Sequence, residues 1–411
     1  QKTAYEIGVR LVGSEMCIRD RSIFLFWDKY SIEPMTKALS WQDTRAQNIV
    51  NEFSNHSDWI WEKTGAPLSP NFGGPKFLHM IRKHPGLRKK VLSSQVFYGP
   101  LSAYLTHALT GIATIDESIA GRTLFFNIHS SDWSKKCMDL FQIPASGLPM
   151  LRPVLYDHGS ICDTNLSLDC VIGDQQAALI GQEGLLRGSI ATNFGTSASV
   201  LYNAGRNPIV VNGLISSVLF SDGKQRKHVV EGTINACNSL FHHLETELNI
   251  SHDFMKWPEL CSNQSTNGIY VPGFAGLAAP YWKSGFNDIY RNLDKFDKNK
   301  IIRAGMESIG FLVNNIIDRL KPIMESKIKS LSASGGSARQ PLLQFIADLT
   351  GIPVTHSAMK DQTAYGVFRL LKSQNDNDDD YQISQTFSPR QDRAELEKKL
   401  SDWQETIESI L

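Results

Sequence analysis

Apolar residues follow two different spacings along this chain, and the change between them predicts two structural parts. Up to about residue 155, helical spacing dominates. The pattern predicts a strand at 22–27, a returning strand at 37–41 and helices at 44–61 and 76–83, the last ended by Pro85-Gly86. From about residue 168 onward, short apolar runs alternate with glycine-containing turns, which is typical of hairpins and βαβ units.

The second part has the more regular pattern. It predicts strands at 168–172, 189–193, 198–203, 331–334 and 352–355, and helices starting at 174 and covering 301–320, 340–350 and 392–411. Runs of strands joined by helices indicate an α/β fold. Because 411 residues exceed what one ordinary core holds, we expect two domains, 22–172 and 173–411.

Residues 1–21 differ in character from the rest of the chain. The sequence QKTAYEIGVRLVGSEMCIRDR contains no signal-peptide pattern and resembles translated sequencing-adapter read-through. A real strand at 7–12 is the alternative. We expect the segment to be non-native, with the true N-terminus missing.

Composition excludes several classes of function. Lys+Arg and Asp+Glu balance at 42 each, so no net field favours nucleic acid or an anionic membrane. The six cysteines form no CxxC pair, which argues against a zinc or disulfide framework. The apolar runs are too short to span a bilayer, and the acidic run 375–380 is most simply a solvated loop.

Three polar or glycine-rich stretches could carry chemistry. Asp174, in Gly173–Ala178 (GDQQAA), follows a predicted strand and could act as a general base, although a helix N-cap is the simpler interpretation. Thr192–Ser197 (TNFGTS) and Ser334–Ala338 (SGGSA) could bring backbone N–H groups close to phosphate, or could be ordinary tight turns. For Tyr270–Trp282 (YVPGFAGLAAPYW) a structural role is simpler.

Taken together and in this order, these stretches resemble the FGGY carbohydrate kinases from about Ser22 to the C-terminus. Phe72–Met80 (FGGPKFLHM) resembles a family signature with His79 in place of Trp, and Trp41–Arg45 (WQDTR) resembles another. GDQQAALIGQ and Gly121–Trp133 (GRTLFFNIHSSDW) resemble the glycerol kinases more than the xylulokinases.

The resemblance implies an actin-like (ribonuclease H-like) two-domain ATPase fold, with the first domain incomplete, and ATP with Mg²⁺ as cofactors. It makes Asp174 the catalytic base. The implied substrate-binding residues are Trp41, Asn71, Asp174, Gln175 and Ser199, and the implied nucleotide-binding residues are Gly195, Thr196, Asn238, His242, Gly335, Gly336 and Gln340.

Departures from the family pattern put strict glycerol specificity in doubt. Asn71 stands where the glycerol kinases have Tyr, and Ser199 stands where they have Phe. Near the nucleotide, Asn238, His242 and Gln340 replace Gly, Gln and Asn.

The family's first phosphate-binding hairpin, which helps to hold Mg²⁺, is not found before Ser22, so we expect little kinase activity from the chain as written. The expected function is phosphorylation of a polyol or sugar hydroxyl by ATP. A ketose kinase of the xylulokinase or ribulokinase type and a non-catalytic actin-like ATP-binding protein are the alternatives. A cytoplasmic enzyme is expected, without nucleic-acid or membrane partners and compatible with a homo-oligomer.

Overall fold

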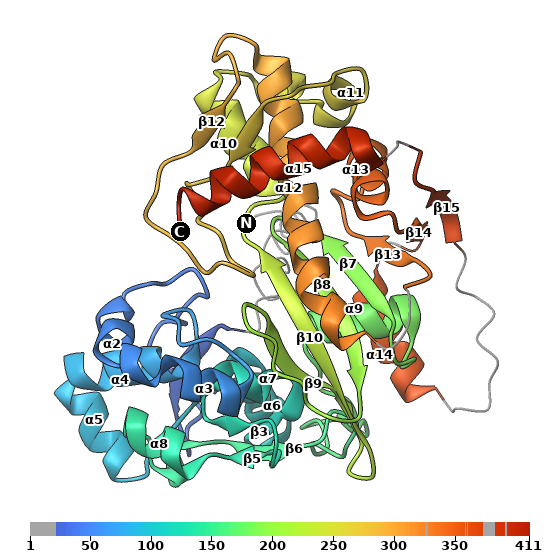
Figure 1. Ribbon diagram of the computed structural model, residues 1–411. Coiled ribbons are helices and arrows are strands. Elements are labelled where there is room, and N and C mark those ends of the chain that lie inside the picture. The colour runs from blue at the N-terminus through green and yellow to red at the C-terminus, as the bar shows by residue number, and fades with distance from the viewer. Residues whose placement is uncertain (1–21, 325–327, 358, 360, 373–382, 391–392) are drawn as a thin grey trace, which may run out of the picture.

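The computed structural model describes residues 22–324, 328–357, 359, 361–372, 383–390 and 393–411. It has two parts, one formed by the first half of the chain and one built around a larger sheet (Figure 1). Residues 1–21 and the acidic run 375–380 lie outside the described residues. No helix in the described ranges is both long and apolar enough to cross a membrane.

The first part is mainly helical around small strand pairs. Strand β1 (Phe24–Asp28) pairs antiparallel with β2 (Val96–Pro100), and β3 (Thr114–Asp116) pairs parallel with β6 (Met150–Arg152). The other elements are α2 (Gln47–Glu52), α3 (Ser57–Thr64), α4 (Gly73–Lys83), α5 (Pro85–Leu92), α6 (Leu101–Thr110), α7 (Glu117–Ala120), β4 (Phe126–Asn127), β5 (Asp132–Trp133) and α8 (Lys135–Phe141).

The second part contains a mixed sheet that, among the described residues, has seven strands in the order β15-β14-β13-β7-β8-β10-β9. Strand β13 runs parallel to both β7 and β14, and the remaining pairs are antiparallel. The strands are β7 (Ile190–Phe194), β8 (Ala198–Gly205), β9 (Ile215–Ser221), β10 (Arg226–Ile234), β13 (Leu331–Ser334), β14 (Val354–Ser357) and β15 (Ile383–Phe387).

Helices cover both faces of this sheet (Figure 1). Because successive strand residues point to opposite faces, Val200 of β8 packs in one core cluster with α12, while Leu201 packs in another with α9. The helices of this part are α9 (Asp174–Glu183), α10 (Asn238–Glu247), α11 (Trp257–Ser262), α12 (Lys298–Leu320), α13 (Gln340–Thr350), α14 (Gln362–Leu371) and α15 (Arg393–Glu408), and the short pair β11 (Ile269–Val271) and β12 (Ile289–Arg291) accompanies them.

Most regular elements lie where the spacing of apolar residues predicts them, but three differ. Residues 37–41 and 168–172 are not strands: the first meets β1 through a single bridge, Phe24 with Leu39, and the second meets Leu155 through Cys170. The predicted helix 44–61 is broken into α2, a short 3₁₀ turn and α3. In each case the local pattern fits more than one backbone path, and tertiary contacts select one.

Candidate active site

A cavity of about 120 Å³ lies between the two parts of the molecule. Its wall comes from both parts, so neither forms it alone. The residues that line it are Ser22, Trp41, Asn71, Phe72, Arg122, Gln175, Ser197, Ser199, Ile215, Thr233, Ile234, Asn235 and Trp282. Four of the predicted substrate residues, Trp41, Asn71, Gln175 and Ser199, therefore meet here.

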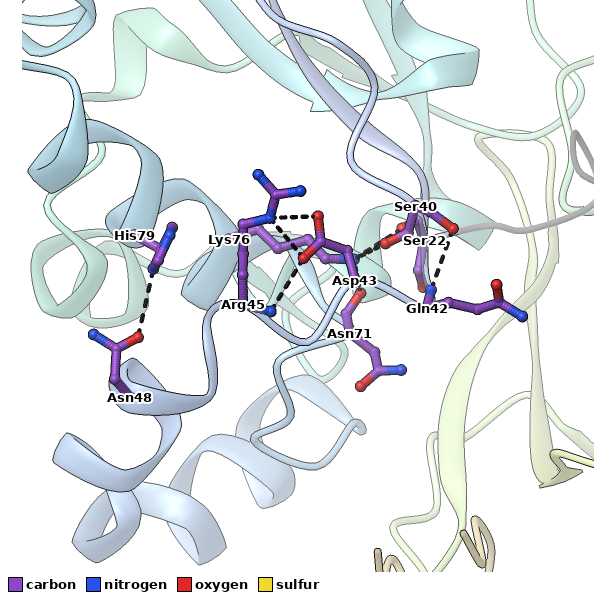
Figure 2. A network of polar contacts seen from close by, with 9 residues as sticks. All are labelled: Ser22, Ser40, Gln42, Asp43, Arg45, Asn48, Asn71, Lys76 and His79. Carbon is purple, nitrogen blue, oxygen red and sulfur yellow. Dashed lines mark hydrogen bonds and ion pairs between the residues drawn. The ribbon is translucent and has the colours of Figure 1, made fainter. Parts of the chain in front are cut away.

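The first-domain wall is organised by a buried lysine (Figure 2). Lys76 of α4 is 1% exposed, and its ammonium group donates to the carbonyl oxygens of Ser40 at 2.7 Å and Asn71 at 2.8 Å. The Asn71 amide donates in turn to the Trp41 carbonyl oxygen at 2.8 Å. Because one charged group binds two loops that are far apart in sequence, Trp41 and Asn71 are held beside each other.

The opposite wall begins at helix α9. Gly173 occupies its N-cap and Asp174 is the first helical residue, so the N-cap interpretation of Asp174 is wrong. The Gln175 amide donates to Asp174 Oδ2 at 3.1 Å and accepts from Asn193 of β7 at 3.3 Å. These contacts join the predicted base, the cavity wall and the central sheet.

The predicted nucleotide residues gather on neighbouring turns. The backbone N–H of Asn238, at the start of α10, donates to the Gly195 carbonyl at 3.0 Å, and that of Cys237 donates to the Thr196 carbonyl at 3.0 Å. Ser337, directly after Gly336, donates through its backbone N–H to the Phe194 carbonyl at 3.0 Å. The β7–β8 turn thus lies between α10 and the β13–α13 turn.

A close backbone approach explains the first glycine of the β13–α13 turn. Gly335 has φ +98°, and a Cβ there would lie 2.3 Å from the Phe194 carbonyl oxygen. Gly336 faces open space, and Gln340 begins α13 with its side chain exposed. His242, one turn along α10, lies 3.1 Å from the Asn238 amide nitrogen. The space beside Gly336 is therefore open.

Comparison with known proteins identifies the family. Residues 20–168 match the N-terminal domain of the FGGY family of carbohydrate kinases, and residues 190–371 match its C-terminal domain. A glycerol kinase from Saccharolobus solfataricus is 30% identical over 99% of this chain and 85% of its own length. The chain belongs to the FGGY family of carbohydrate kinases.

Other relatives of this FGGY kinase support the same assignment. Glycerol kinase from Mycoplasmoides gallisepticum is 29% identical over 97% of this chain and 82% of its own length. A crystal structure of Plasmodium falciparum glycerol kinase with ADP superposes with a TM-score of 0.85 at 26% identity, covering 95% of this chain and 82% of that one. A xylulose kinase from Lactobacillus acidophilus shares the fold, with a TM-score of 0.80 at 19% identity over 94% of this chain and 82% of that one. The predicted actin-like two-domain α/β fold is confirmed.

The sequence did not single out an ion pair on the cavity wall of this FGGY kinase. Arg122, in the first domain, donates to Glu231 of β10 at 2.6 Å, and both side chains are almost fully buried. Arg122 lies in the GRTLFFNIHSSDW segment, but a conspicuous segment gives no sign of a partner 109 residues away. Because this pair is excluded from water, removing either partner would leave a buried charge uncompensated and should destabilise the contact between the two parts.

A second connection reaches the start of α9. Asp116, fully buried at the end of β3, accepts hydrogen bonds from the Ser118 hydroxyl and, at 2.9 Å, from the Ser118 backbone N–H. The Ser118 hydroxyl oxygen accepts from the Gly173 backbone N–H at 2.8 Å. Burial raises the pKa of Asp116 from 3.8 to about 7, and the Ser118 hydrogen bonds oppose that rise without cancelling it.

The Asp116 carboxyl is expected to make the stability of the protein depend on pH. The folded state keeps its proton up to about pH 7, whereas the unfolded chain loses it near pH 3.8. The contribution of Asp116 to the free energy of unfolding is therefore complete below its pKa in the unfolded chain, and it is lost as pH rises through its pKa in the folded protein. Between pH 5 and pH 8 we expect the free energy of unfolding in urea to fall by about 2–3 kcal/mol more in wild type than in Asp116→Asn. Equal pH slopes in the two proteins would contradict the assignment.

Proposed function

We propose that this protein transfers the γ-phosphoryl group of ATP to a hydroxyl group of a small polyol, with glycerol as the first candidate. The observation that carries the proposal is the position of Asp174 and Gln175. Gln175 lines the cavity with Trp41 and holds the Asp174 carboxylate at 3.1 Å. Gln175 also contacts Asn193, two residues before Gly195 on the β7–β8 turn. Gln175 thus links the Asp174 carboxylate to the cavity wall on one side and to the strand before the proposed nucleotide turn on the other.

The proposed chemistry depends on this order of groups. Asp174 accepts the proton of the attacking hydroxyl, while Gln175 and the cavity wall orient the polyol. The turn at Gly195 and Thr196 is proposed to lie against the transferring group, where backbone donors would stabilise its charge. The open surface at Gly336 and the exposed start of α13 are proposed to accept the nucleotide, as expected for a kinase of the FGGY family.

Mg²⁺ is proposed to arrive with the nucleotide. The phosphates themselves are proposed to be its main ligands. When bound, the ion neutralises phosphate charge. We further propose a cytoplasmic location, which agrees with the free cysteines of the described residues and with the balanced charge.

A ketose kinase is the competing enzymatic function, because Asn71 and Ser199 replace two aromatic residues. The Asn71 amide does not favour it strongly, since the amide nitrogen donates to Trp41 and its oxygen accepts from Ser69 at 2.9 Å. Phe72 and Trp282 keep aromatic surface on the wall. A non-catalytic ATP-binding protein would not need a carboxylate at Asp174.

Substrate preference tests which kinase this is. If loss of the two aromatics has enlarged the cavity, kcat/KM for erythritol, D-ribulose or xylulose should equal or exceed that for glycerol, because an aromatic side chain occupies a large contact area. The measurement compares these substrates in a coupled ADP-release assay. It uses the 411-residue chain and a chimera in which residues 1–21 are replaced by the N-terminal segment of the Saccharolobus solfataricus glycerol kinase.

The outcomes separate the alternatives. A clear preference for glycerol over every longer substrate would reject the enlarged cavity and leave the kinase assignment standing. If the chimera binds ATP but turns over no polyol or ketose, the non-catalytic ATP-binding function replaces both the polyol kinase and the ketose kinase as the proposed function. Turnover by the 411-residue chain itself would contradict the expectation that this chain has little kinase activity.

A further inference from the structure

Two histidines and a glutamate converge on the outer side of helix α10, outside the cavity. His242 and Glu245 are three residues apart and therefore share one helix face. After the helix the chain folds back, fixed by the Ile250 backbone N–H donating to the Glu245 carbonyl at 2.9 Å. This turn places His252 over the last turn of α10, with its ring stacked on His242 at 5.5 Å between centroids.

The ring nitrogens point at the two oxygens of one carboxylate. His242 Nδ1 lies 3.2 Å from Glu245 Oε2, and His252 Nδ1 lies 2.8 Å from Glu245 Oε1. Two ligands about 2.1 Å from a tetrahedral ion lie about 3.4 Å apart. One ligand-capable atom from each of the three residues lies within 4.8 Å of the others, so small side-chain movements would bring them to the separations that such an ion needs.

We propose that His242, Glu245 and His252 form a site for a transition-metal ion of the Zn²⁺ class. Two imidazoles and one carboxylate leave a fourth position for water, and imidazole nitrogen favours Zn²⁺ over Mg²⁺. The two histidine side chains are 52% and 75% exposed, so an ion can enter from solvent. The site shares His242 with the predicted nucleotide-binding residues, but its test does not depend on kinase activity.

Coordination through Nδ1 requires that this atom carry no proton, so the N–H of each ring must be on Nε2 when the ion is bound. For His252, the exposed side chain lets water receive the Nε2–H. For His242, Nε2 now accepts from the Asn238 amide nitrogen, whose oxygen accepts from the Ser337 hydroxyl at 3.2 Å. If the Asn238 side-chain amide is turned over, its oxygen can accept from the Nε2–H of His242. Its nitrogen can then donate to the Ser337 hydroxyl, because a hydroxyl can accept as well as donate. The surrounding network therefore tolerates the bound ion.

Calorimetric titration of the 411-residue chain with ZnCl₂ tests the site. We expect one ion per chain, no displacement by excess MgCl₂, and at least about tenfold weaker binding in His252→Ala and Glu245→Gln, each of which removes a ligand. His84→Ala, which removes another exposed histidine, should bind as wild type does. His242 is left intact because it is also a proposed nucleotide residue.

A second probe identifies the donor atoms. Co²⁺ in the same site should give the visible bands of a tetrahedral nitrogen and oxygen site, without thiolate-to-cobalt charge transfer. Charge transfer, or undiminished Zn²⁺ binding by His252→Ala and Glu245→Gln, would mean that the exposed thiol of Cys162 or another group binds the metal. Either result, or no saturable binding by wild type, overturns the proposal.

Discussion

Asp174→Asn is expected to lower kcat by about 10²-fold or more while leaving polyol binding nearly unchanged. The amide matches the carboxylate in size but cannot take the proton of the attacking hydroxyl, and loss of a general base typically costs a factor of this order. Gly173, not Asp174, occupies the N-cap of α9, so the substitution removes no cap. The measurement is steady-state turnover of the chimera with the best substrate, together with the polyol Kd.

A matched variant separates chemistry from charge. Asp58→Asn also removes a carboxylate from the first turn of a helix, α3, but Asp58 is exposed and lies away from the cavity, whereas Asp174 is half-buried at the start of α9. It should leave kcat within about twofold. If Asp174→Asn turns over as fast as Asp58→Asn, then Asp174 serves only the helix, and the proposed mechanism fails.

Gly366→Ala is expected to destabilise the protein by about 3 kcal/mol or more. The backbones of helices α9 and α14 are in contact at this point. A Cβ on Gly366 would lie 1.9 Å from the Ala177 carbonyl oxygen, and a Cβ on Gly181 would lie 2.1 Å from the Gln362 carbonyl oxygen. Backbone atoms cannot turn aside as a flexible side chain can, so the helices must separate. That cost exceeds the gain of up to about 1 kcal/mol that alanine brings to a helix interior.

The control is Gly86→Ala in helix α5. A Cβ there meets nothing within 4 Å, so only the helix propensity changes, and the free energy of unfolding should stay equal or rise slightly. Urea unfolding of both variants is compared with wild type. Equal stability of Gly366→Ala and Gly86→Ala would mean that α9 and α14 do not pack as closely as described. Because α9 carries Asp174 and Gln175, a soluble Gly366→Ala protein should also lose turnover.

The sequence predicted the elements whose pattern is local. The spacing of apolar residues located α12 and α13, and the alternation around Phe194–Ser197 located β7 and β8. Local spacing could not decide whether 37–41 and 168–172 pair as strands, because an extended apolar segment that forms one bridge has the same pattern as one that forms a ladder.

Identifying the candidate site required both the sequence motifs and the tertiary structure. Motifs in family order pointed to Trp41, Asn71, Gln175 and Ser199, which line one cavity, while the roles assigned to them stay predictions. The residues around them had no local signal. Trp282 lies in a stretch whose simplest interpretation was structural, and Thr233 and Asn235 lie in no motif.

The sequence by itself determined the periodic elements, the tight turn at Gly335 and the family to which the motifs belong. These depend on residues within one or two turns of each other, where side-chain spacing fixes the backbone. Only the tertiary structure decided the contact of Arg122 with Glu231, the backbone contact of α9 with α14, and the convergence of His252 on His242 and Glu245. Each of these depends on the path of the intervening chain, and that path is set by the packing of the whole core rather than by any local pattern.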